Sequence, residues 1–216
     1  MPGSQRTVRR LWPWPDTRGT AAVEFAIIMA FFLVVFIGSF ELLTLLRTSQ
    51  KLNIVAATVA QAVAYQSPDG SAMSSSTPQD ICYGAVKGLQ PFSANGLTID
   101  IASVTTTTPG SAVNYWEQDF SGASCTPVTS AVIGGNSACG LATANGAGGM
   151  LPKTNGAVGD NAIIVRATLT YPGIVGLWLN TSPTLTQQVL TRWAYASTTT
   201  SLTVTGLTPQ PLSCSG

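Results

Sequence analysis

Histidine is absent from this chain of 216 residues, and charged side chains make up only 9% of it. Soluble domains usually carry about a quarter of charged residues, so part of the chain is predicted to lie outside water. Without histidine, the ordinary Ser-His-Asp and Cys-His catalytic arrangements cannot form. The four cysteines include no C-x-x-C pair, which argues against a zinc site. We therefore expect a non-enzymatic protein that holds no metal and no cofactor.

Positive charge is concentrated at the start of the chain. Residues 1–19 hold four arginines and one aspartate, a net charge of +3, whereas the rest holds six basic and eight acidic side chains, a net charge of −2. A basic patch beyond this leader is missing, which argues against nucleic acid as a partner. The glycine-rich stretches GGNSACG and GAGGM lack the P-loop lysine, and no small-molecule substrate is expected.

A long apolar run follows the leader. Residues 25–40 read FAIIMAFFLVVFIGSF, with Ser39 as the only polar residue, and further apolar residues follow Glu41 as far as Leu46. About 20 helical residues cross a bilayer core of ~30 Å, so residues 25–46 predict one transmembrane helix. The alternative, a cleaved secretory signal, needs a shorter core and a small-x-small cleavage site, and neither is present here. The preceding arginines place the N-terminus in the cytoplasm and the later residues outside it.

The helix is predicted to continue beyond the membrane. Residues 47–65 contain no glycine or proline, and apolar residues recur at helical spacing. These are Leu45, Leu52, Val55, Val59 and Val63, with Arg47, Lys51, Thr58 and Gln61 largely on another face. A helix over 20–65 is about 70 Å long. Its apolar face has two interpretations: packing against the chain's own outer domain, or contact with neighbouring subunits.

Glu24 stands where hydrocarbon should begin. A carboxylate costs about 2.5 kcal/mol or more at mid-membrane and less near the interface, so it usually needs a partner. Arg18 lies beyond a helix break that we expect at Gly19, out of helical reach. Spacing alone leaves open whether Glu24 sits in headgroup water, where the helix dipole favours an anion, or has a specific partner. Glu41 is interpreted as an interfacial residue at the outer leaflet, with subunit contact as the alternative.

Residues 18–64, RGTAAVEFAIIMAFFLVVFIGSFELLTLLRTSQKLNIVAATVAQAVA, resemble the N-terminal signature of TadE-like proteins. These are pilin-like proteins of the tight-adherence (Flp, type IVc) pilus system of bacteria. The family opens with Arg-Gly, small residues and Val-Glu-Phe, then continues with an apolar run, a glutamate near its end and a helix dotted with Arg, Gln and Asn. The matching positions are Arg18, Gly19, Val23, Glu24, Phe25, Glu41, Arg47, Gln50 and Asn53. Residues 162–195 are more loosely similar to the family's closing strands.

The resemblance implies processing and assembly. In such proteins a membrane prepilin peptidase cuts after the glycine, here between Gly19 and Thr20, and removes the basic leader. Glu24 and Phe25 then become the fifth and sixth residues of the mature chain. The new α-amine at Thr20 would pair with Glu24 of a neighbouring subunit, so that two costly charges neutralise each other on assembly. The implied partners are the inner membrane, the peptidase, other pilin-like subunits and Tad assembly proteins.

The expected fold class is α+β and pilin-like. A single long N-terminal transmembrane helix continues as a periplasmic amphipathic helix and is followed by a small antiparallel β-sheet. The domain plan is a cytoplasmic leader at 1–19, the helix at 20–65, a linker at 66–79 and an extracytoplasmic β-rich domain at 80–216. The inference to a pilin head rests on the resemblance, because this order of elements is not distinctive by itself.

Within the outer domain, a short helix is expected at 80–90 with Asp80 as its N-cap. Strands are expected at 97–106, 162–171, 184–195 and 201–206, whereas 107–160 is interpreted as loops with at most one short strand. Asp100, Glu117, Asp119 and Asp160 are interpreted as scattered, with a pair such as Glu117 and Asp119 on a loop surface. Tyr115, Trp116 and Trp193 are interpreted as core or loop anchors, with a sugar- or surface-binding role as the alternative.

The cysteines are expected to form two disulfides, because the residues after the membrane helix lie in an oxidising space. Cys82, Cys125, Cys139 and Cys214 allow three pairings, and the sequence does not choose among them. We favour Cys125–Cys139 together with Cys82–Cys214, which would close a short loop and tie the C-terminus back to the start of the domain.

The leading functional hypothesis is a minor pilin or pseudopilin that joins or primes a tight-adherence pilus used for surface attachment. It would be a single-pass protein of the bacterial inner membrane with a periplasmic C-terminal domain, or a component of the fibre. The second hypothesis is an uncleaved periplasmic scaffold of the Tad secretion machinery. An anchored enzyme is the third and least supported, because catalytic constellations are missing from the sequence.

Overall fold

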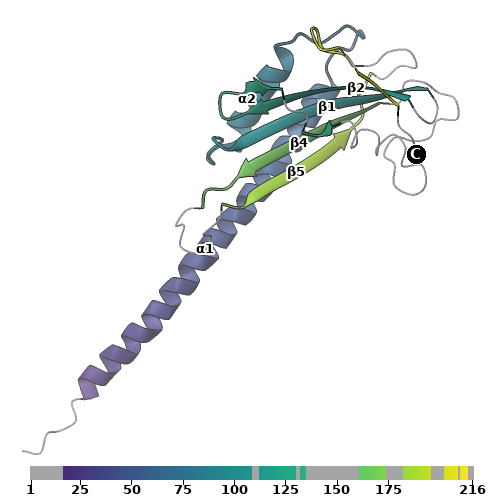
Figure 1. Ribbon diagram of the computed structural model, residues 1–216. Coiled ribbons are helices and arrows are strands. Elements are labelled where there is room, and N and C mark those ends of the chain that lie inside the picture. The colour runs from purple at the N-terminus through teal and green to yellow at the C-terminus, as the bar shows by residue number, and fades with distance from the viewer. Residues whose placement is uncertain are drawn as a thin grey trace, which may run out of the picture. The chain divides into compact units, whose positions relative to one another are not determined.

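A computed structural model describes residues 17–108, 112–129, 132–134, 161–173, 182–195, 202–208 and 210–213. The elements, shown in Figure 1, are α1 (Thr17–Ala64), α2 (Thr77–Leu89), β1 (Leu97–Thr108), β2 (Ala112–Ser121), β3 (Thr126–Val128), β4 (Asn161–Thr170), β5 (Thr184–Thr191) and β6 (Gln210–Ser213). The chain divides into two compact units, Met1–Leu43 and Thr44–Gly216, and we call the second unit the head. The expected α+β architecture, a long apolar helix followed by an antiparallel sheet, is confirmed.

In the first unit, α1 is apolar around its whole circumference. Large hydrophobic side chains on all sides are exposed, among them Phe25 at 64%, Phe32 at 61% and Phe36 at 71%. A helix that is hydrophobic all round is suited to a membrane or to the centre of a large protein. Within the described residues, α1 is the one helix that is long and apolar enough to cross a membrane, as a single anchor requires.

The head is built on an antiparallel sheet with the strand order β3-β2-β1-β4-β5, and β6 pairs with the beginning of β2. β1 and β4 confirm the strands expected at 97–106 and 162–171. β5 confirms the strand expected from residue 184 but ends at Thr191.

Two expectations about strands are wrong. The stretch interpreted as loops contains β2, a strand of 10 residues, and the short β3. The acidic residues of β2 lower its apparent strand propensity, and its strand character becomes clear only from its pairing with β1, β3 and β6. In the stretch expected as a strand at 201–206, the described residues make only an isolated bridge between Met73 and Val204, and the closing strand is β6.

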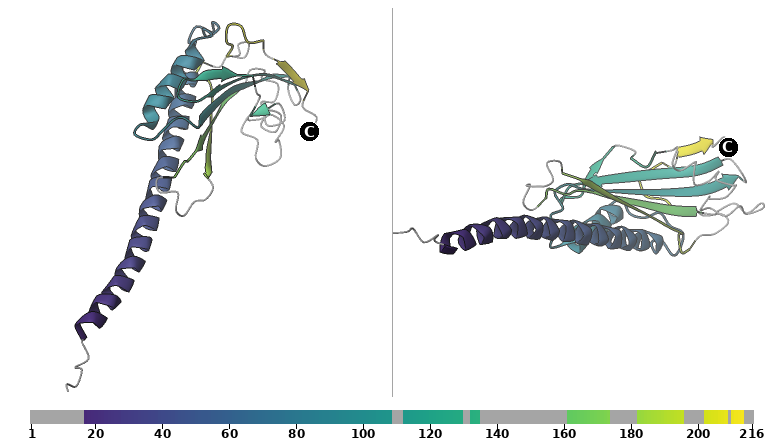
Figure 2. Two further views of the ribbon diagram at one scale, coloured as in Figure 1. Left: turned by 60° about the vertical axis from the view of Figure 1, so that its left-hand side comes forward. Right: turned by 90° about the horizontal axis from the view of Figure 1, so that it is seen from below.

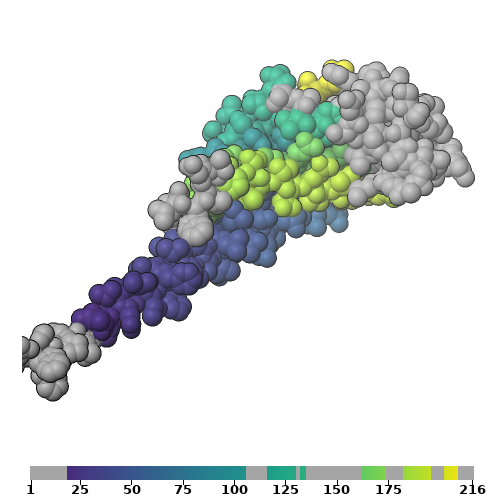
Figure 3. Space-filling view, turned by 60° about the horizontal axis from the view of Figure 1, so that its bottom comes forward, coloured from purple at the N-terminus to yellow at the C-terminus, as the bar shows by residue number. Residues whose placement is uncertain are grey.

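The core lies between the two helices and one face of the sheet, which we call the inner face. Its strand residues alternate along the chain and include Ile99, Ile101, Phe120, Val165 and Ala167. The part of α1 that belongs to the head and the helix α2 lie on the same side of the sheet, as Figure 2 shows. In Figure 3, β5 (light green) runs beside the blue part of α1, and there the Gln187 amide donates a hydrogen bond to the Ser49 hydroxyl at 3.3 Å.

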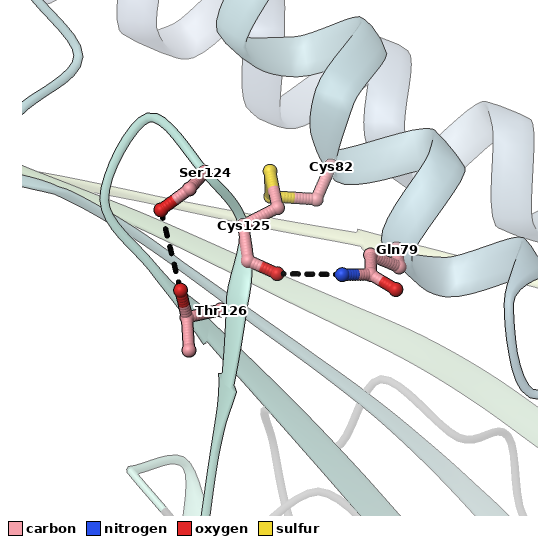
Figure 4. The surroundings of a disulfide bond; sticks show 5 residues. All are labelled: Gln79, Cys82, Ser124, Cys125 and Thr126. Carbon is pink, nitrogen blue, oxygen red and sulfur yellow. Dashed lines mark hydrogen bonds between the residues drawn. A yellow bond between two sulfur atoms is a disulfide. The ribbon is translucent and has the colours of Figure 1, made fainter.

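A disulfide between Cys82 and Cys125 joins α2 to the turn between β2 and β3 (Figure 4). Both cysteines are buried, and the Gln79 side-chain amide donates a hydrogen bond to the Cys125 carbonyl at 3.3 Å. The favoured pairing is therefore wrong in both its bonds, because each of them used one of these two cysteines. Cys139 and Cys214 lie outside the described residues.

The helix expected at 80–90 begins earlier than predicted. α2 starts at Thr77, with Ser76 at the N-cap, and Asp80 lies in its first turn instead of capping it. Pro78 explains the earlier start, since proline is favoured in the first helical positions, where its missing N–H is not needed.

Candidate functional site

The expected processing junction lies in the first turns of α1. The helix begins at Thr17 and continues through Gly19 without a break, so the expected interruption there is wrong. Gly19 and Thr20 are exposed, and a Cβ added to Gly19 would meet nothing within 4 Å. Neither a turn nor close packing therefore requires glycine at this position, and in an intact helix its missing side chain costs up to about 1 kcal/mol relative to alanine.

Glu24 and Phe25 follow the junction by about one helical turn. Both side chains are exposed, and Glu24 is four residues after Thr20, a spacing that places the two on the same helix face. The surrounding surface is apolar, with Val23 60% and Ile28 54% exposed. Glu24 is thus a carboxylate displayed at the beginning of an apolar helical surface.

Glu41 behaves differently from Glu24. It is only 3% exposed, and both of its carboxylate oxygens are buried without a hydrogen bond from the described residues. The expectation that Glu41 lies at the outer leaflet stays a prediction.

The apolar face of α1 beyond the membrane segment is occupied by the head itself. Leu52, Val55, Val59 and Val63 are between 0% and 3% exposed and belong to the hydrophobic core. The interpretation in which this face packs on its own domain is correct, and the face is not available to neighbouring subunits. The large apolar side chain that remains outside is Ile54, which is 60% exposed.

The antiparallel register gathers three carboxylates on the outer face of the sheet, opposite the inner face. Asp100 on β1 pairs with Asp119 on β2, and Glu117 lies two residues before Asp119, on the same face. Asp100 and Asp119 are each only 1% exposed. We call Asp100, Glu117 and Asp119 the carboxylate cluster. Their interpretation as scattered residues, with a pair on a loop surface, is wrong, because strand pairing joins them; Asp160 lies outside the described residues.

The carboxylate cluster binds the backbone of residues 132–134. The two Glu117 oxygens accept hydrogen bonds from the N–H groups of Ile133 at 2.6 Å and Gly134 at 3.0 Å. Asp119 accepts one from the N–H of Val132 at 3.3 Å. Three successive backbone donors are therefore held by two side chains of β2.

Arg166 supplies the positive charge that faces the cluster. The strand register places it on β4 directly opposite Asp100. Its guanidinium donates hydrogen bonds to the Val132 carbonyl at 3.0 Å and to the side-chain oxygen of Gln188 on β5. Arg166 is thus one cation beside three acidic side chains, and these hydrogen bonds go to neutral oxygens.

The environment changes the proton affinity of two cluster members. Burial raises the pKa of Asp119 to about 8, and the charges of Glu117 and Asp100 act in the same direction, whereas the hydrogen bond from the Val132 N–H opposes them. Burial also raises the pKa of Asp100 to about 6, with Glu117 adding to the effect and Arg166 opposing it. Both shifts favour the protonated form of these two carboxyl groups. Within the described residues, no group of three or more His, Cys, Asp or Glu side chains could hold a metal ion.

The two described tryptophans of the head are core anchors, as one of the two interpretations predicted. Trp116 is 4% exposed, and its indole N–H donates to the Leu202 carbonyl at 2.7 Å. Trp193 is 2% exposed and donates to the Gln66 carbonyl at 2.8 Å. A buried tryptophan usually finds such a partner for its N–H group. Neither ring is displayed for binding a sugar or a surface.

Comparison with known proteins identifies the N-terminal segment. The family model described as TadE-like protein matches residues 19–61. The match starts at Gly19 and follows α1 through the apolar run and into the head. No curated protein and no solved structure matches the chain.

Proposed function

We propose that this chain, a TadE-like protein over residues 19–61, is a minor pilin or pseudopilin that joins or primes a tight-adherence pilus. Family membership implies a role in Tad pilus assembly, and TadE-like proteins are pilin-like and generally non-catalytic. In the finer proposal, a prepilin peptidase cuts between Gly19 and Thr20. The protein then stays anchored in the inner membrane, with its head in the periplasm, until it enters or initiates a fibre.

The observation that carries this proposal is the surface of α1 after Gly19. From Val23 to Phe36, apolar side chains are exposed all round the helix, and Glu24 is a carboxylate displayed among them. Such a surface is stable in lipid or against other helices, where Glu24 is costly until it meets a positive charge. The α-amine created at Thr20 would supply that charge. Assembly would then be favoured by pairing Glu24 with the Thr20 amine of a neighbouring subunit.

Helical spacing adds a competing geometry. Within one chain, Thr20 and Glu24 are one turn apart on the same face, so the carboxylate could also approach the amine of its own chain. Only pairing of Glu24 with the Thr20 amine of a neighbouring subunit links charge neutralisation to assembly. This pairing requires neighbouring helices to be staggered along their axes.

The second candidate, an uncleaved scaffold of the secretion machinery, is favoured by a specific observation. α1 is helical at Gly19, whereas a peptidase needs access to the backbone of the bond that it cuts. Cleavage would therefore require the first turns of α1 to open. Opening costs least at a helix end, where the first four N–H groups have no helical partner, and glycine lowers the cost further.

Mass spectrometry of the membrane-extracted protein distinguishes the two candidates. We expect an intact mass and an N-terminal residue that correspond to a chain beginning at Thr20. Gly19→Ala should abolish this processing without harming the fold, because an added Cβ meets nothing within 4 Å. The matched control is Gly84→Ala, which replaces another helical glycine with open space around it and should leave processing unchanged.

A chain that keeps its arginine leader in cells with active peptidase would contradict the processing claim. The scaffold proposal would then replace the pilin proposal. Equal cleavage of wild type and Gly19→Ala would place the cut elsewhere or assign it to another protease.

A further inference from the structure

We propose that the carboxylate cluster of Asp100, Glu117 and Asp119 is a proton-held clasp, which anchors residues 132–134 to the outer face of the sheet and loosens as the pH around the head rises. This inference concerns the folded head alone. It does not depend on cleavage of the leader or on entry of the protein into a pilus.

The first argument is that the cluster contains more buried acidic oxygens than donors. Both oxygens of Asp100 and one of Asp119 are buried and accept no hydrogen bond from the described residues. An ionised carboxylate without a partner is strongly disfavoured in such a place, and the group takes up a proton instead. A protonated carboxyl group loses its charge and gains an O–H donor.

A proton fits this cluster better than a metal ion does. Within the described part of the chain, no group of three or more His, Cys, Asp or Glu side chains is arranged so that it could hold a metal ion. Glu117 already uses both oxygens on backbone N–H groups, at 2.6 and 3.0 Å. The guanidinium of Arg166, on the strand beside Asp100, would repel a cation further.

The second argument is that one side chain connects the proton to the anchored segment. Asp119 accepts the hydrogen bond of the Val132 N–H, and Glu117, two residues earlier on the same face of β2, accepts those of Ile133 and Gly134. Two neighbouring carboxyl groups can form a hydrogen bond with each other only while one of them is protonated. Loss of that proton places two negative charges side by side, as in other sites where two carboxylates share one proton. Release of residues 132–134 would admit water and relieve the repulsion.

The charged groups that face Asp119 are limited to a few strands. β1 contributes Asp100, β2 contributes Glu117, and β4 contributes Arg166, whereas β5 contributes the neutral Gln188. The anchored residues 132–134 are apolar and have no titratable side chain. Among the described residues, therefore, the cluster balances three acids against one base.

The pKa values of Asp100 and Asp119 set the pH range over which the clasp should open. Burial and the neighbouring acids raise the pKa of Asp119 to about 8 and that of Asp100 to about 6. In an opened clasp, both carboxyl groups would return toward the ordinary value of 3.8. The closed clasp therefore binds more protons than the open one. Between pH 6 and 8, the equilibrium constant for opening should rise by up to about tenfold per pH unit. Above pH 8 this constant should level off.

Hydrogen–deuterium exchange of the full chain in detergent micelles tests this proposal. Exchange of a peptide containing Ile133 and Gly134 is followed at pH 6, 7, 8 and 9 and corrected for the intrinsic pH dependence of amide exchange. In the wild type, protection should fall by up to about tenfold per pH unit from pH 6 to 8. Asp119→Asn keeps an acceptor oxygen and carries a permanent N–H donor, so its protection should stay constant over this range.

Two further variants make the experiment specific. Asp80→Asn removes an exposed acid from α2 and should keep the wild-type profile. Glu117→Gln leaves only one acceptor oxygen for two N–H donors, so protection should be lost at every pH. The proposal would be overturned if amide protection in the wild type did not change with pH. It would also be overturned if protection fell equally in the wild type and in Asp119→Asn.

A measurement without any variant covers the case in which Asp119→Asn fails to fold. Carbon-13 NMR of the aspartate carboxyl carbons in the folded wild type should show one that titrates near pH 8. If every aspartate in the folded protein titrates below about pH 5, near the ordinary range for this side chain, the proposal is wrong.

Discussion

Asp100 and Asp119 face each other across the ladder between β1 and β2, and each residue is only 1% exposed. Like charges directly opposite each other weaken a sheet, and burial together with the neighbouring acids favours the neutral, protonated form of these carboxyl groups. The native head therefore binds protons that the unfolded chain would release at the same pH. This coupling makes the stability of the head a function of pH.

Stability should fall as the pH rises from about 4 to about 8. The pKa of Asp119 is about 8 in the folded head against 3.8 for an unperturbed aspartate. A raised carboxyl pKa means that its contribution is most favourable below the unfolded value and is lost as the pH approaches the folded value. Each extra bound proton corresponds to about 1.4 kcal/mol per pH unit. Thermal unfolding of the full chain in micelles at pH 5 and 8 measures this loss.

Asp119→Asn should reduce that pH dependence and raise the melting temperature at pH 8. Asp69→Asn is the control, because the pKa of Asp69 is shifted in the opposite direction. Hydrogen bonds from Ser71 lower the pKa of this exposed aspartate. A wild-type melting temperature that is the same at pH 5 and 8 would contradict the assignment of buried protons.

Removal of the disulfide between Cys82 and Cys125 should destabilise the head by about 2–4 kcal/mol. The bond joins residues separated by 43 positions, so it restricts a long loop of the unfolded chain. The double variant Cys82→Ser/Cys125→Ser avoids an unpaired thiol, and chemical denaturation measures its free energy of unfolding. Wild type should lose a similar amount on reduction. A double variant as stable as the oxidised wild type would show that this link does not stabilise the head.

Substitutions at two positions on α1 distinguish its packing within the head from its contact with other subunits. Leu52 is fully buried and Ile54 is 60% exposed, and replacement of either by alanine removes the same number of carbon atoms. Leu52→Ala should lower the free energy of unfolding by about 2–4 kcal/mol, whereas Ile54→Ala should change it by less than about 0.5 kcal/mol. If Ile54→Ala reduces the amount of protein in sheared fibres without changing stability, the exposed face of α1 contacts other subunits. Equal destabilisation by both variants would contradict the packing of this helix.

Glu24→Gln should leave processing intact and reduce assembly. The amide cannot neutralise the proposed α-amine at Thr20, so we expect at least a tenfold smaller share of the protein in sheared fibres, or about 1.4 kcal/mol of lost coupling. Immunoblots of the fibre and membrane fractions measure this share. Gln61→Ala, at an exposed polar position of the same helix, is the control. Unchanged fibre levels in Glu24→Gln would remove the charge-pairing part of the proposal.

Local patterns predicted the elements whose signal is contained in a short window. The apolar run after Phe25, the helical spacing from Leu52 to Val63 and the alternation in β1 and β4 each appear within about ten to twenty residues. Such periodicities follow directly from helix and strand geometry. β2 escaped prediction because two of its polar residues, Glu117 and Asp119, belong to the carboxylate cluster, so its strand character depends on partners from elsewhere in the chain.

The sequence by itself determined the apolar helix, the carboxylate at its beginning and the likeness to TadE-like proteins, because these are properties of consecutive residues. Tertiary structure decided that Cys82 bonds to Cys125, that the second half of α1 packs on its own head, and that Asp100 meets Asp119. These contacts join residues far apart in the chain, and strand register is what brings the two aspartates together. The proton-binding cluster is therefore a product of the fold, although each of its residues is visible in the sequence.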